Sequence, residues 1–241
     1  MDSQSIILIA AALVTSIVSG TMGMAGGILL LAVMAEFFAP TVLIPLHGVV
    51  QLASNGSRTL ILFKYIRWNI AAWFAVGALV GALFGSQLVV EIPKSKFQIG
   101  IGLFILLVTF APRPKVAANF KGKWLGVGGM AGFMSLFVGA TGPLIAPFFL
   151  REGLPKEVLV ATKAACQAFA HLFKIGTYAA MGFLLQPYIG LVIAMVLTVF
   201  LGNYLGKQLL ARIPEAWFVH FFKILIVVLA IRLIWKGYNG L

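Results

Sequence analysis

Two polar stripes lie on otherwise apolar segments of the sequence, and both carry residue types that can bind an anion. The first stripe consists of His47, Gln51, Asn55 and Arg58. On an α-helix, this spacing keeps the four side chains within about 80° of one face. The second stripe repeats the spacing and consists of Lys163, Gln167, His171 and Lys174. Together the stripes offer cationic groups and amide donors.

The chemistry of the stripes favours an anion over a cation. Ionisable side chains are costly inside a membrane and normally face the protein interior or a watery cavity. Glu36 is the one acidic residue that the sequence places within an apolar segment, so a cation would find few ligands. We predict that the stripes line an anion site, with Gln51 and Gln167 best placed for contact. The alternatives are that the stripes bind helices together, or that Arg58 and Lys174 extend to the membrane surface.

Two glycine-rich turns interrupt pairs of short apolar segments, at 5–19 with 24–38 and at 125–138 with 143–150. Such a break at membrane depth frees backbone N–H groups at the positive end of a helix dipole, and glycine lets a ligand approach the backbone. We therefore add the turn residues to the predicted substrate site: Gly23, Gly26, Gly27, Gly139, Thr141 and Gly142. For Gly26 and Gly27 the alternative is close helix packing.

The composition shows what must position these residues. Of 241 residues, 61% are hydrophobic and 10% charged, and the mean hydropathy is +1.06. A soluble domain carries about 25% charged residues, so lipid must be the solvent for most of this chain. We predict an all-α polytopic membrane protein with roughly eight to ten membrane segments.

Motifs recur in the same order in the two halves of the chain. The glycine turn and the polar stripe both return, and the second stripe begins 116 positions after the first. Glycines spaced by four also return, from Gly81 and Gly85 to Gly202 and Gly206, and we predict that they form helix-packing faces. This pattern predicts a first transmembrane repeat at 1–112, a basic linker at 113–123 and a second transmembrane repeat at 124–241.

The charge distribution predicts how the repeats are oriented. The net charge of +12 would suggest nucleic acid in a soluble protein, but most basic residues here lie in short loops, so no nucleic-acid partner is expected. The loop at 64–67 and the linker are basic and are predicted to be cytoplasmic. The second-half counterpart of the 64–67 loop, at 182–188, is uncharged and is predicted to face outside. The reversal predicts inverted repeats, which suit alternating access.

Several functional classes lack support in the sequence. A single cysteine, Cys166, excludes an internal disulfide and a cysteine-based metal cluster. No nucleotide-binding loop, paired acids or nucleophile elbow is present, so we expect no cofactor, no metal site and no enzyme. An anion channel and a non-transporting membrane subunit stay open as alternatives. Proton coupling through His47 or His171 also stays open.

The glycine turns and the two stripes resemble those of the sulfite exporter TauE/SafE family, also described as a sulfonate-uptake permease family. The resemblance covers nearly the whole chain. It implies a multi-pass secondary carrier of the bacterial inner (plasma) membrane for a small sulfur-containing oxyanion or organosulfonate, such as sulfite, thiosulfate or sulfoacetate. The expected partners are this anion, the lipid bilayer and, as an option, a second copy of the chain in a homodimer.

Overall fold

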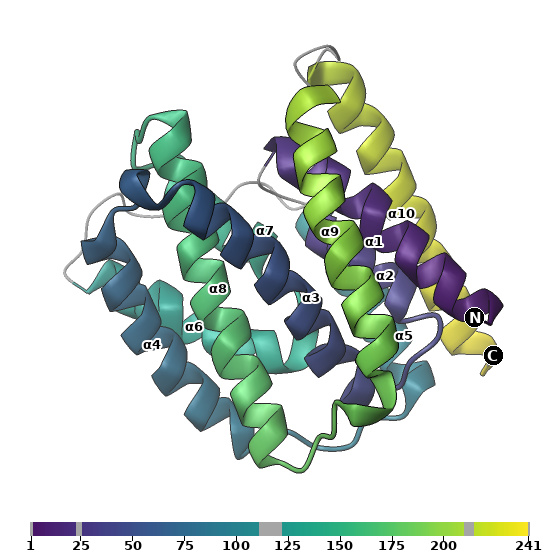
Figure 1. The fold of residues 1–241 in the computed structure, drawn as a ribbon. Coiled ribbons are helices and arrows are strands. Elements are labelled where there is room, and N and C mark those ends of the chain that lie inside the picture. The colour runs from purple at the N-terminus through teal and green to yellow at the C-terminus, as the bar shows by residue number, and fades with distance from the viewer. Residues whose placement is uncertain (1, 23–25, 111–121, 210–214, 241) are drawn as a thin grey trace. The chain divides into compact units, whose positions relative to one another are not determined.

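The structure is a computed structural model that describes residues 2–22, 26–110, 122–209 and 215–240. Over these residues the chain forms helices joined by turns, with no strand (Figure 1). The first half contributes α1 (Ser3–Met22), α2 (Gly26–Met34), α3 (Pro40–Ile61), α4 (Trp68–Ser86) and α5 (Lys94–Phe110). The second half contributes α6 (Lys123–Val138), α7 (Gly142–Leu150), α8 (Lys156–Ala180), α9 (Ile189–Leu209) and α10 (Glu215–Asn239). Two short 3₁₀ helices, Phe63–Tyr65 and Gln186–Tyr188, follow α3 and precede α9.

The described helices confirm the predicted fold class. Three of them, α4, α8 and α9, are each long and apolar enough to cross a membrane. Large apolar side chains such as Leu83 on α4 and Leu197 on α9 are more than half exposed, as lipid-facing residues would be. The chain is therefore an all-α polytopic membrane protein.

The predicted helix breaks are present at both turns. In the second half, α6 ends at Val138 and α7 begins at Gly142, as predicted. In the first half, α1 ends at Met22 and α2 begins at Gly26. Gly23 lies outside the described residues. Both helices that follow a break, α2 and α7, are only nine residues long, about 13 Å at 1.5 Å per residue, so neither can span the bilayer.

The chain forms two compact units, and each unit takes helices from both halves of the sequence. Unit 1 comprises Met1–Leu43, Glu91–Pro112 and Tyr188–Leu241. Unit 2 comprises Ile44–Val90 and Arg113–Pro187. Thus α1, α2, α5, α9 and α10 belong to unit 1, and α4, α6, α7, α8 and most of α3 belong to unit 2. The predicted repeats therefore do not coincide with the compact units, and the duplication stays a prediction.

Unit 1 is built on two close helix pairings, α1 with α9 and α5 with α10. A Cβ atom at Gly206 of α9 would collide with the carbonyl oxygen of Ile17 on α1. Similarly, a Cβ atom at Gly237 of α10 would collide with the carbonyl oxygen of Ser95 on α5. Glycine at these positions lets the two backbones approach closely. Membrane helices associate largely through such van der Waals packing, because the hydrophobic effect does not drive helices together in lipid.

Unit 2 is built on an equally close pairing of α4 with α6, against which α8 packs. Gly77 and Gly81 of α4 face the backbone of α6, at the carbonyl oxygens of Leu125 and Gly129. Small residues also fill the core, including Ala71, Ala78, Ala131, Ala161, Ala165, Cys166 and Ala170. The prediction that the four-spaced glycines are packing faces is confirmed for both units.

The two tightest pairings are counterparts of each other under the predicted duplication. In that scheme α1 corresponds to α6, and α4 corresponds to α9. The pairing of α4 with α6 in unit 2 is then the same contact as that of α9 with α1 in unit 1. Each joins the first helix of one half to the fourth helix of the other half, which is why each unit is assembled from both halves.

Two glycines of α6 provide a matched test of the close pairing. A Cβ atom at Gly128 would collide with the backbone of Phe74, whereas no heavy atom lies within 4 Å of a Cβ atom at Gly126. We expect Gly128→Ala to destabilise the protein by about 1–3 kcal/mol, because the backbone must move apart. Gly126→Ala should be neutral or stabilising, since alanine has the higher helix propensity. Thermal unfolding of the purified protein in detergent measures both, and equal melting temperatures would contradict the assignment.

Candidate substrate site

The two polar stripes lie on α3 and α8 and are buried within the same compact unit. All eight predicted stripe residues belong to unit 2, and each is at least nine-tenths buried. The opposite faces of these helices are apolar and exposed, for example at Leu60 of α3 and Leu172 of α8. Both helices therefore turn a polar face inward and an apolar face outward, the reverse of a helix in a soluble protein.

The stripes touch each other near the middle of the two helices. The imidazole rings of His47 and His171 lie edge to face, with their centroids 6.1 Å apart. One residue further on, a Cβ atom at Gly48 would lie 2.7 Å from Cε of Lys174. Because Gly48 has no side chain, the aliphatic part of Lys174 can pack against α3 at this position.

The second glycine turn lies against the stripe of α8. Gly139 has φ 80°, a left-handed conformation that favours glycine. Its carbonyl oxygen accepts a hydrogen bond of 2.9 Å from Nζ of Lys174. Nε2 of Gln167 donates to Oγ1 of Thr141 at 3.3 Å. These contacts bring the turn and the stripe of α8 together, and their predicted role in binding a substrate stays a prediction.

The N-terminus of α7 opens next to Gln167. The first backbone hydrogen bond at this end runs from N of Ile145 to O of Thr141, at 3.2 Å. The N–H groups of Gly142 and Leu144 come before that bond, and Pro143 has none. The nearest heavy atom to a Cβ atom at Gly142 would be Oε1 of Gln167, 3.8 Å away. Backbone donors and the positive end of a helix dipole thus lie at this end of α7, and the Gln167 amide lies beside them. A helix N-terminus of this kind suits an oxyanion.

The C-terminal part of the α3 stripe, Asn55 and Arg58, forms hydrogen bonds within α3 itself. Arg58 donates from Nε to the carbonyl oxygen of Ser54 at 3.1 Å, and from a terminal nitrogen to Oδ1 of Asn55 at 3.2 Å. Asn55 in turn donates from Nδ2 to the carbonyl oxygen of Gln51 at 2.9 Å. The alternative that Arg58 and Lys174 extend to the membrane surface is wrong, because both side chains are buried.

The electrostatic environment of the site is positive. His171 is 2% exposed, and its Nδ1 atom has no hydrogen-bond partner among the described residues. The ionisable side chains that interact with this imidazole are Lys174, His47 and Arg58, with no carboxylate among them. Lys163 is buried on the same face of α8. A ligand that entered this region would meet positive charge and hydrogen-bond donors.

The first glycine turn has a different environment. A Cβ atom at Gly26 would collide with the carbonyl oxygen of Thr15 and lie 2.7 Å from Cβ of Ser19, both on α1. The packing alternative therefore accounts for Gly26. Gly26 and Gly27 belong to unit 1, whereas the stripes and the second turn belong to unit 2. A ligand role for Gly26 and Gly27 stays a prediction, as it does for Gly23.

A comparison with protein-family models decides the class of this molecule. The model described as sulfite exporter TauE/SafE matches residues 8–233. The chain belongs to the TauE/SafE family. The resemblance noted in the sequence is thereby confirmed, and the TauE/SafE chain is a membrane transporter. Comparisons with curated proteins and with solved structures gave no match.

The structure of this TauE/SafE protein adds residues that the spacing of the stripes did not include. Ser54 accepts hydrogen bonds from Arg58 through both its carbonyl and its hydroxyl oxygen. Its position four residues before Arg58 is a helical spacing that could have identified it. Gly48 gave no such signal, since its importance depends on how closely α8 approaches α3.

Gly48 and Gly56 on α3 form a matched pair for testing the site. Gly48→Ala would push the Lys174 ammonium away from the carbonyl oxygen of Gly139, whereas no heavy atom lies within 4 Å of a Cβ atom at Gly56. We expect Gly48→Ala to raise the KM of anion uptake at least about fivefold, because a displacement of about 1 Å at a binding group is costly. Gly56→Ala should keep the KM of the unmodified protein. Uptake into proteoliposomes measures both, and a normal KM for Gly48→Ala would refute the role assigned to this contact.

Proposed function

We propose that the chain is a secondary transporter for a small anion, which binds where the N-terminus of α7 meets the polar stripes of α3 and α8. The observation that carries the proposal is the contact of Lys174 and Gln167 with the glycine turn that precedes α7. The substrate would be held by backbone N–H groups of α7 and by the Gln51 and Gln167 amides. Asn55, His171 and the cations of the stripes would complete the site.

The donor set favours an oxyanion with several acceptor oxygens. A helix N-terminus, side-chain amides and lysine ammonium groups all donate hydrogen bonds, and charge-assisted bonds to an anion are about twice as strong as neutral ones. Membership of the TauE/SafE family supports an oxyanion that contains sulfur, such as sulfite, thiosulfate or an organosulfonate like sulfoacetate. The membrane would be the bacterial inner membrane.

Alternating access between two inverted repeats is the mechanism that we infer. Its support is the exchange of equivalent helices, α4 onto α6 and α9 onto α1, together with the reversed loop charges of the two halves. Transporters of this kind place broken helices at the midplane of the bilayer, with helix N-termini directed at anionic groups. The nine-residue helix α7 has the length for such a half-helix.

A substrate panel tests the proposed activity. We expect proteoliposomes with the purified chain to take up labelled sulfite, thiosulfate or sulfoacetate with saturation and to show counterflow, while chloride uptake stays at the level of empty liposomes. Counterflow occurs because a carrier exposes its site to one side at a time. Uptake of all four anions without saturation would indicate a channel, and no uptake of any would indicate a non-transporting subunit.

Replacement of a single amide tests the proposed site. Gln167→Leu removes the amide that donates to Thr141 beside the start of α7, with little change in size. We expect anion affinity to fall about tenfold or more, because the proposed hydrogen bond from this amide to a charged ligand is lost. Gln186→Leu, the same substitution at an exposed position before α9, is the control and should leave uptake unchanged. If Gln167→Leu transports as well as the control, the substrate does not bind at α7.

A further inference from the structure

Two glutamates lie at matching places beyond the two short helices. Glu36 comes two residues after the end of α2, and Glu152 comes two residues after the end of α7. Glu152 lies 116 positions after Glu36, the same displacement that relates Lys163 to His47. The chain has only six acidic residues, so a matched pair among them calls for a physical explanation.

In unit 1, the Glu36 carboxylate is held by the C-terminal helix. Glu36 is 8% exposed, and its two oxygens contact Nε of Arg232 at 3.2 Å and Nζ of Lys236 at 3.0 Å. Arg232 and Lys236 are one helical turn apart on α10, so both reach the same carboxylate. An acid this well buried needs such partners, since an unpaired buried charge is strongly destabilising.

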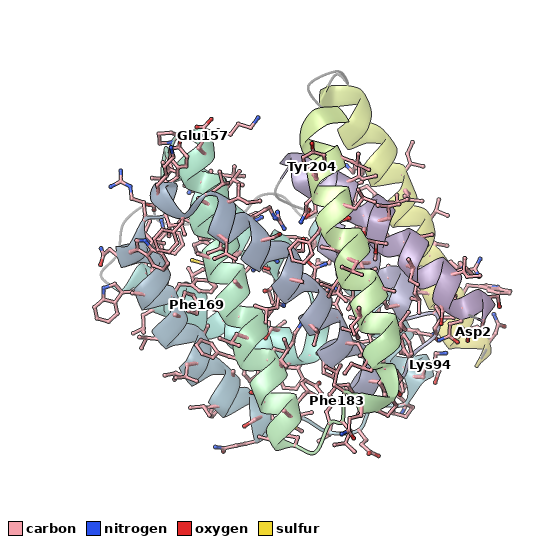
Figure 2. All side chains as sticks on the ribbon, viewed as in Figure 1. Asp2, Lys94, Glu157, Phe169, Phe183 and Tyr204 are labelled. Carbon is pink, nitrogen blue, oxygen red and sulfur yellow. The ribbon has the colours of Figure 1, made fainter. Side chains whose placement is uncertain are left out.

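The backbone of the same turn is held by α5. Nζ of Lys94 donates to the carbonyl oxygen of Glu36 at 3.0 Å, and Nε2 of Gln98 donates to the carbonyl oxygen of Ala35 at 3.0 Å. Lys94 is labelled in Figure 2, at the start of α5. Carbonyl groups at the end of a helix lack partners within it and carry the negative end of its dipole, which a lysine complements. The end of α2 is thus tied to both α5 and α10, which pack on each other.

In unit 2, a corresponding tie holds the end of α7. The Glu152 carboxylate pairs with Nζ of Lys123, the first residue of α6, which is 5% exposed. The same ammonium lies 5.1 Å from the ring centroid of Trp124, and that ring packs against Phe149 of α7 at 4.6 Å. The N-terminal end of α6 therefore contacts the C-terminal end of α7.

We propose that Glu36 and Glu152 are matched anchors that fix the C-terminal ends of α2 and α7, so that the N-terminal ends of these helices, at Gly26 and Gly142, are held in position for transport. A rigid nine-residue helix with one end tied transmits a displacement of that end to the other. Glu152 is thus a positioning residue for the proposed anion site at Gly142, and Glu36 is one for the N-terminus of α2. This inference rests on the proposed function for its effect on transport.

A cysteine reporter tests the positioning role without relying on transport. In the full chain with Cys166→Ala, a reporter Gly142→Cys is labelled with a maleimide. We expect Glu152→Gln to change the labelling rate at least about threefold, because the helix end about 13 Å away has lost its tie. Glu157→Gln is the matched control, an exposed glutamate at the start of α8, and should leave the rate unchanged. Glu36→Gln with a Gly27→Cys reporter, and Glu91→Gln as its control, tests the other anchor.

Uptake of labelled sulfite into proteoliposomes then separates positioning from stability. We expect Glu152→Gln to raise KM at least about fivefold. We expect the exchanged pair, Lys123→Glu with Glu152→Lys, to restore much of the lost affinity.

If Glu152→Gln does not fold, the exchanged pair decides the question. A folded exchanged pair with near-normal KM supports the anchor, and an unfolded exchanged pair overturns it. Unchanged labelling and unchanged KM in Glu152→Gln overturn the anchor while leaving the proposed function intact. Absence of uptake by the unmodified chain overturns the function, and the labelling rates still decide the anchor.

Discussion

The hydrogen bond from the Lys174 ammonium to the carbonyl oxygen of Gly139 is the interaction on which the rest of the site depends. Lys174 is fully buried within a membrane protein, where an ammonium group without acceptors would be very costly. In the interior of a regular helix, each carbonyl oxygen already accepts a backbone hydrogen bond. The break between α6 and α7 presents the carbonyl oxygen of Gly139 to the buried lysine, so the broken helix stabilises the buried ammonium group.

A rigid frame is needed to keep such a contact in place, and glycine provides it. Between α4 and α6 the backbones approach so closely that a methyl group at Gly77, Gly81, Gly128 or Gly132 would collide with a carbonyl group on the facing helix. Close approach maximises dispersion contacts, which replace the hydrophobic effect as the source of stability in lipid. With α6 fixed against α4 in this way, the turn after α6 has a defined position relative to α8.

The sequence predicted those features of the structure that depend on local pattern. Helical spacing identified the buried stripes, and short apolar segments next to glycine identified the break at Gly139. Contacts between distant segments had no such signal: Glu36 and Arg232 are 196 residues apart, and nothing in the spacing of either connects them. The sequence also did not predict that α4 pairs with α6 and α9 with α1, because this depends on the three-dimensional pairing of helices from different halves. Both stripes therefore fall in one compact unit, a result that periodicity alone does not contain.

The two glycine turns of the predicted duplication differ in a way that bears on where the ligand binds. A Cβ atom at Gly26 would collide with the backbone of α1, whereas the nearest heavy atom to a Cβ atom at Gly142 would be Oε1 of Gln167, 3.8 Å away. The first stripe belongs to unit 2, as do the second stripe and the turn before α7. Close packing against α1 accounts for Gly26. The two turns of the predicted duplication therefore have different surroundings.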